Sequence, residues 1–103
     1  MSQIVTNKIS QVARLCRRHR VESMYVFGSA NTDTFNAHSD IDVMVSFGDV
    51  DLLEHFNNLV SFKQGLEKIF ARPVDLLEEN AIQNPVLLRS INLNKQLIYG
   101  RAN

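Results

Sequence analysis

Two short stretches decide the fold of this chain of 103 residues: MYVFGS at positions 24–29 and SDIDV at positions 39–43. The first is an apolar run that stops at Gly28, which is typical of a buried strand that ends in a small-residue turn. The second alternates acidic and apolar residues, so it predicts a strand with Asp40 and Asp42 on one face and the core on the other. Together the two stretches predict a turn and a pair of carboxylates at the edges of neighbouring strands.

A pair of carboxylates on one strand face indicates a metal site. Residues two apart on a strand have Cα atoms about 6.5–7 Å apart, which suits two divalent cations about 3.5–4 Å apart, as used for in-line phosphoryl displacement. Asp75 lies inside a further apolar run, PVDLL at 73–77, where a solvated aspartate is not expected. Asp-x-Asp and Gly-Ser are each common, and either alone is most often a solvated strand edge or an ordinary loop. Their combination with a third strand aspartate favours metal-dependent transfer of a nucleotidyl or phosphoryl group.

In order and spacing, these motifs resemble the minimal nucleotidyltransferase family, the small single-domain members of the DNA polymerase β-type nucleotidyltransferase superfamily. The residues that carry the resemblance are VFGS at 26–29, SDIDV at 39–43 and VDL at 74–76. Residues 84–99 are similar to the closing segment of the family. The resemblance therefore implies a nucleotidyltransferase-like fold, and we expect one such domain over residues 1–103.

The resemblance also implies roles for particular residues. It places Gly28, Ser29 and Ser39 against the nucleotide, with Gly28 and Ser29 at its phosphates. It makes Asp40 and Asp42 ligands of two Mg²⁺ ions. Asp75 would complete the metal site where the acceptor hydroxyl is activated, so all three aspartates are expected to be catalytic.

Similar proteins are often paired with a HEPN-domain toxin in bacterial toxin–antitoxin modules, where the nucleotidyltransferase is the antitoxin and can adenylylate a tyrosine of the toxin. The resemblance thus implies transfer of AMP from ATP to a hydroxyl of such a partner, or to an acceptor held by a homo-oligomer. One departure is that residues 30–39 contain no Lys or Arg, and only His38 could contact a phosphate there. An antitoxin that acts by binding alone therefore stays an alternative, and a metal-dependent phosphohydrolase is a further one.

Composition narrows the class of partner and the compartment. The formal net charge is zero and the pI is about 6.8, so no overall field attracts nucleic acid or an anionic membrane. Four arginines at positions 14, 17, 18 and 20 form either a solvated helix end or a patch that contacts an anion or a partner. The single cysteine, Cys16, is expected in the core and fits a reducing compartment. With neither a signal peptide nor an apolar run of about 20 residues, the chain is expected in the cytoplasm.

The remaining pattern predicts a small α/β (α+β) domain, with a mixed sheet of three to four strands and helices packed on one face. Strands are expected at 23–28, 40–47 and 73–77, while residues 96–99 could be a short strand or the end of a helix. Helices are expected at 2–19, from Asp49 or Asp51 to 70, and from a break at Asn84-Pro85 to about 94. The long helix is expected to bury a stripe made of Leu52, Phe56, Leu59, Leu66 and Phe70.

Overall fold

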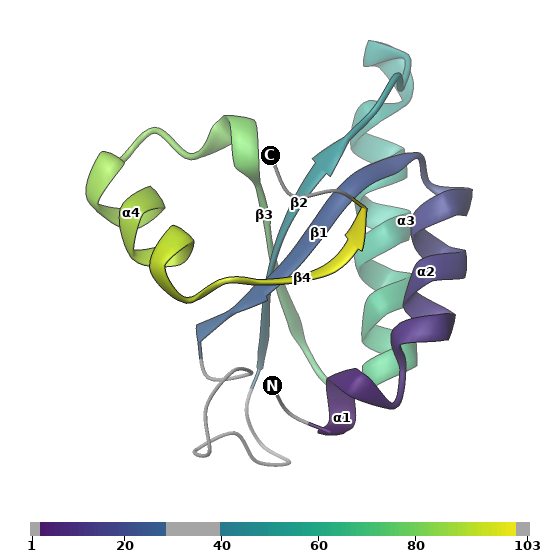
Figure 1. Cartoon of the computed structure of the whole chain (residues 1–103). Coiled ribbons are helices and arrows are strands. Elements are labelled where there is room, and N and C mark those ends of the chain that lie inside the picture. The colour runs from purple at the N-terminus through teal and green to yellow at the C-terminus, as the bar shows by residue number, and fades with distance from the viewer. Residues whose placement is uncertain (1–2, 29–39, 101–103) are drawn as a thin grey trace.

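The computed structural model describes residues 3–28 and 40–100, and its centre is a sheet of four strands (Figure 1). The strands lie in the order β3-β2-β1-β4. Strand β1 is antiparallel to both β2 and β4, whereas β2 and β3 are parallel. Their bounds are Val21–Phe27 for β1, Ile41–Phe47 for β2, Val74–Glu78 for β3 and Gln96–Gly100 for β4. The predicted mixed sheet is confirmed, and the open question at residues 96–99 is settled as a strand.

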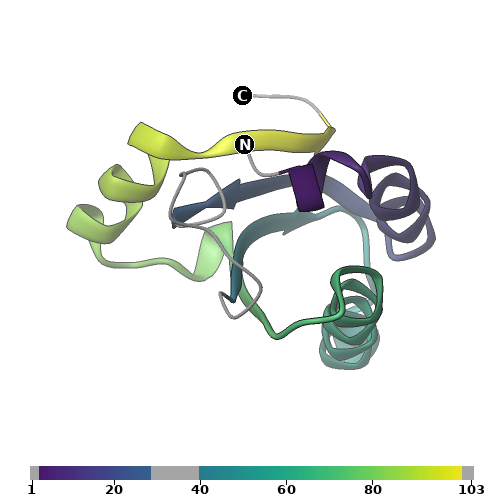
Figure 2. The same ribbon diagram turned by 90° about the horizontal axis from the view of Figure 1, so that it is seen from below.

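Helices cover the two faces of this sheet unequally. The bounds are Gln3–Thr6 for α1, Ile9–Arg18 for α2, Leu52–Phe70 for α3 and Pro85–Asn94 for α4, with a 3₁₀ turn, η2, at Glu79–Ala81. Helices α2 and α3 lie side by side on one face, as expected, while α4 lies on the other side of the sheet (Figure 2). The position of α4 was not expected from the sequence.

Alternation along the strands builds a separate apolar cluster on each face. Met24 and Val26 of β1 join the main core beneath α2 and α3, whereas Tyr25, between them, joins a smaller cluster with Met44 of β2 and Ile91 of α4. Successive side chains of a strand point to opposite faces, so these contacts identify the face of every other strand residue. The face that carries α4 is the one on which the acidic residues of β2 and β3 will be found.

The predicted first helix is divided in two. Thr6 ends α1 and Ile9 begins α2, because the amide of Lys8 donates to the carbonyl of Val5, three residues back, at 3.1 Å. This tighter bond interrupts the regular pattern of bonds four residues apart. Cys16 of α2 is fully buried, as expected, and burial raises the pKa of its thiol to about 12.

The long helix α3 begins where predicted but does not bury the stripe that was predicted. Asp51 caps it by accepting a hydrogen bond from the amide of Leu53 at 3.0 Å. Leu52 and Phe56 are 87% and 70% exposed, so the first half of the predicted stripe is wrong, whereas Phe62, which was not predicted, is fully buried. Leu66 and Phe70 are buried as predicted.

The side of α3 that faces the rest of the protein is polar in its first half and apolar in its second half. The Nε2 of His55 lies 2.6 Å from a carboxylate oxygen of Glu78, and its ring packs edge-on against Phe47. One turn further, the amide of Asn58 donates to the carbonyl of His19 at 2.8 Å. These two residues take the inward positions in the first half of the helix, which leaves the neighbouring apolar residues outside.

The last helix follows its sequence signals closely. The side chain of Asn84 accepts hydrogen bonds from the amides of Val86 and Leu87 at 2.9 and 3.3 Å, and Pro85 is the first helical residue. The break before Pro85 and the end at Asn94 are both as predicted. None of the helices in the described parts of the chain is long and apolar enough to cross a membrane.

Candidate active site

Two of the three predicted aspartates lie side by side, Asp42 on the inner strand β2 and Asp75 on the edge strand β3. Asp75 is exposed, so the expectation that this aspartate is not solvated was wrong, because an edge strand leaves it open to water. Asp42 and Asp75 are direct neighbours in the parallel register of β2 and β3, so their Cα atoms lie about 4.8 Å apart. On its other side Asp42 is paired with Phe27, the last residue of β1. Both carboxylates alternate with residues of the main core, and they therefore occupy the face that carries α4.

Asp40 completes the acidic group from just outside the strand. It is exposed and lies two residues before Asp42. The pKa of Asp42 is raised above its ordinary value, first by burial and then by the negative charges of Asp75 and Asp40. The structure thus brings all three predicted aspartates into one electrostatic neighbourhood, in which each additional negative charge is unfavourable.

Such a group fits a divalent cation by its chemistry. Carboxylate oxygens are the ligands that Mg²⁺ prefers. A cation would offset the negative charges of Asp75 and Asp40, which add to the effect of burial on the pKa of Asp42. Within the described residues, no three His, Cys, Asp or Glu side chains already form a cage for a metal ion. Like-charged carboxylates are expected to point apart when no cation lies between them.

Gly28 forms the wall of the site next to Asp42. Its φ is +66°, and a Cβ atom there would lie 2.5 Å from Oδ2 of Asp42. Only glycine adopts this conformation without strain and leaves room for the carboxylate. The family resemblance implied that Gly28 contacts the nucleotide phosphates, and in this structure its N–H donates to Oδ1 of Asn94 at 3.2 Å.

Asn94 was not predicted as a site residue. It lies at the end of α4, 66 positions from the glycine that it contacts, and no local sequence signal marks it. It links α4 to the turn after β1. Ser29, His38 and Ser39 lie outside the described residues.

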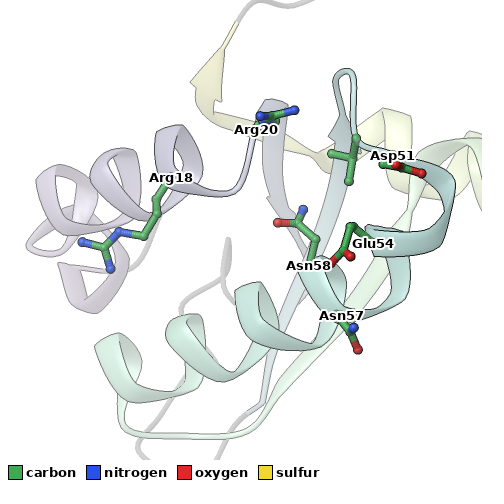
Figure 3. Close-up of a pocket in the computed structure, with 7 residues that line it drawn as sticks. Arg18, Arg20, Asp51, Glu54, Asn57 and Asn58 are labelled. Atoms are coloured by element: carbon green, nitrogen blue, oxygen red, sulfur yellow. The ribbon is translucent and has the colours of Figure 1, made fainter.

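A separate hollow is found at the other end of the sheet, where β1 begins and β2 ends (Figure 3). It has a volume of about 430 Å³, with Arg18 and Arg20 on one side and Asp51 and Glu54 on the other. Arg20 donates to the carbonyl of Asp49 at 2.9 Å. Part of the arginine cluster therefore lines a polar hollow remote from the three aspartates. The full lining is Arg18, Arg20, Val50, Asp51, Glu54, Asn57 and Asn58.

The sheet carries paired aspartates on adjacent strands, beside a glycine turn. Carboxylates in this arrangement can hold divalent metal, which promotes the transfer of nucleotidyl groups. Residues 7–103 match the family model described as "Polymerase beta, Nucleotidyltransferase". The chain belongs to this family of nucleotidyltransferases. The resemblance drawn from its motifs is thereby confirmed.

Individual relatives agree with this assignment. A protein of Methanocaldococcus jannaschii, provisionally named as a protein adenylyltransferase, is 32% identical over an alignment of 99 positions that covers 88% of this chain and 96% of the relative. A solved structure provisionally described as a minimal nucleotidyltransferase has a TM-score of 0.74 and 24% identity, covering 91% of this chain and 92% of the other.

A further solved structure is described as a tri-AMPylated Shewanella oneidensis HEPN toxin in complex with an MNT antitoxin. The matching chain of that complex has a TM-score of 0.66 and 20% identity, with 94% of this chain and 73% of the other covered. At these identities the two solved structures establish the fold alone.

Proposed function

We propose that this chain, as one domain over residues 1–103, transfers AMP from ATP to a hydroxyl of a partner protein with the help of Mg²⁺. The observation that carries the proposal is the acidic group: Asp42 lies beside Asp75, and burial, together with the negative charges of Asp75 and Asp40, raises its pKa. In a family of nucleotidyltransferases, such a group of mutually repelling carboxylates is best explained as a cation site.

Each residue of the site would have a distinct role in the reaction. Asp40, Asp42 and Asp75 would hold divalent metal, which we expect to be two Mg²⁺ ions that supply positive charge where the transferred phosphate becomes more negative. Gly28 leaves space for the carboxylate of Asp42 and keeps the turn close to it. Ser29 and Ser39 would add hydroxyl donors to the nucleotide. Asp75, the neighbour of Asp42, would complete the metal site where the acceptor hydroxyl is activated.

We infer that the acceptor belongs to a HEPN-domain toxin and that the chain is its antitoxin. The Shewanella complex supports this inference, because it pairs an AMPylated HEPN toxin with an MNT antitoxin and one chain of the complex has the same fold as this protein. A homo-oligomer that holds the acceptor is the second arrangement we consider. The reaction would take place in the cytoplasm, where reduced Cys16 and supplies of ATP and Mg²⁺ are expected.

The proposal is tested with ATP labelled in its α-phosphate, Mg²⁺ and a cognate HEPN-domain protein. The partner should become labelled and pyrophosphate should be released. Asp40→Asn, Asp42→Asn and Asp75→Asn should each lower the rate by at least about a hundredfold, because these groups act together. Asp49→Asn is the matched control, since Asp49 is exposed and lies at the opposite end of β2.

One observation favours a second function for the same fold. The absence of Lys and Arg from residues 30–39 removes a common source of charge for binding a triphosphate. If the wild-type chain labels nothing and the triple aspartate variant still neutralises the toxin, the chain acts by binding alone. Release of inorganic phosphate in place of pyrophosphate would indicate a phosphohydrolase.

A further inference from the structure

The acidic site would carry an excess of negative charge when a nucleotide is bound, and the segment after Gly28 has no Lys or Arg to balance it. Three carboxylates gather there, and a nucleoside triphosphate would add several more negative charges. The segment of residues 29–39 contains no Lys or Arg. A Lys or Arg of this chain that adds to the positive charge of bound metal must therefore come from another segment.

We propose that Lys95 is this cation and that it binds the β- and γ-phosphates of the nucleotide, an inference that rests on the proposed function. The register of the sheet is the first argument. Gln96 of β4 pairs with Val26, and continuing this antiparallel register by one residue sets Lys95 opposite Phe27. Phe27 is itself paired with Asp42. Lys95 therefore extends the row of the acidic residues, with its Cα about 10 Å, or two strand spacings, from that of Asp42.

The direction of the Lys95 side chain is the second argument. Its Nζ lies 4.2 Å from the centre of the Tyr25 ring. Tyr25 packs with Met44 on the face that carries α4, and Asp42 alternates onto that same face. The ammonium group therefore lies on the acidic face, over the Tyr25–Met44 pair, which is the next pair on that face after Phe27 and Asp42.

The contact with the Tyr25 ring does not neutralise the positive charge of Lys95. A cation–π contact holds an ammonium group in place without neutralising it. Within the described residues, Lys95 makes no ion pair with a carboxylate. A positioned cation that has not been neutralised is suited to bind an anionic ligand.

The backbone of Lys95 is also tied to the glycine turn. The preceding residue, Asn94, accepts the hydrogen bond from the N–H of Gly28. This hydrogen bond links the end of α4, directly before Lys95, to the wall of the Asp42 site.

The test is calorimetric titration with AMP-PNP and, in parallel, with AMP, both in the presence of Mg²⁺. Lys95→Met should weaken binding of AMP-PNP by at least about tenfold, the usual scale for losing a charge-assisted hydrogen bond. It should weaken binding of AMP by much less, because AMP has no β- or γ-phosphate. Lys95→Arg should restore most of the affinity for AMP-PNP. Lys68→Met is the control, since Lys68 lies on α3, on the other face of the sheet.

The outcomes separate this inference from the function on which it rests. If wild type does not bind AMP-PNP, the proposed function falls and the role of Lys95 falls with it. If wild type binds and Lys95→Met binds equally well, only the role of Lys95 is overturned. An equal loss of AMP and AMP-PNP binding, with an unchanged melting temperature, would also overturn it, because the contact would then not be to the outer phosphates.

Discussion

At the scale of single residues, the site is organised around Asp42. Its neighbours Val43 and Ile41 are fully buried, so the strand cannot turn its carboxylate away from the acidic face without exposing the core. Asp75 is fixed beside it by the parallel pairing of β2 and β3. The fold therefore maintains a repulsion that lowers its own stability, as is common at sites that bind charged ligands.

The pH dependence of stability should reveal this repulsion. Because the folded-state pKa of Asp42 is raised above 3.8, the folded protein binds more protons than the unfolded chain just above pH 3.8. Stability attributable to Asp42 should therefore fall as the pH rises through that interval. At neutral pH and without metal, Asp42→Asn should raise the free energy of unfolding by about 1 kcal/mol or less, because solvent screens the repulsion. Denaturant unfolding measures this difference. A variant less stable than wild type across the whole pH range would refute this.

Gly28 should be far less tolerant of a methyl group than Gly48. Gly28→Ala forces a left-handed residue with a Cβ 2.5 Å from the Asp42 carboxylate, and the conformation alone costs about 1–2 kcal/mol. Gly48→Ala is the control, because its nearest neighbours would lie at 3.3–3.4 Å and its φ is not positive. Urea unfolding and AMP-PNP titration should both show a larger loss at Gly28. Equal losses at the two glycines would contradict the close approach.

At the scale of elements, α3 shows what a hydrophobic pattern can and cannot predict. Its length and its Asp51 cap are local properties, and both were predicted from the sequence. Which side of the helix faces the sheet depends on contacts with distant residues, such as that between His55 and Glu78. For this reason Phe56 was predicted to be buried and is not, while Phe62 was overlooked.

Two phenylalanines of α3 give a direct test of this orientation. Phe62→Ala should lower the free energy of unfolding by about 3–5 kcal/mol, because it empties a fully buried position. Phe56→Ala should change it by no more than about 0.5 kcal/mol, since Phe56 is 70% exposed. Chemical denaturation of the two variants under identical conditions measures both. A larger effect at Phe56 would mean that α3 is rotated relative to this structure.

At the scale of the whole molecule, the sequence predicted the parts of the site better than their assembly. Alternation in SDIDV predicted that Asp40 and Asp42 share a face, because that is a local property of a strand. The closeness of Asp75 depends on the parallel pairing of β2 with β3. The contact of Asn94 with Gly28 depends on α4 crossing to the second face of the sheet. Neither arrangement leaves a trace in short-range sequence periodicity.

The same reasoning applies to the last strand and the first helix, which the sequence did not predict accurately. Residues 96–100 become a strand only because β1 offers them an edge, and their own alternation is weak. The division of the first helix at Lys8 rests on a single tightened hydrogen bond that no sequence pattern signals. Long-range pairing and small backbone adjustments are thus what the sequence alone does not supply.

The central claim is that Asp40, Asp42 and Asp75 form a metal and nucleotide site, and thermal melting with and without Mg²⁺ and ATP tests it most directly. Wild type should melt higher with Mg²⁺ and higher still with Mg²⁺ and ATP, by roughly 10 °C or more when ligand is about a hundredfold above its Kd. Asp42→Asn should start from a higher melting temperature without metal and then fail to respond, whereas Asp49→Asn should respond like wild type. A wild-type melting curve indifferent to metal and nucleotide, or an Asp42→Asn variant that responds fully, would contradict the account.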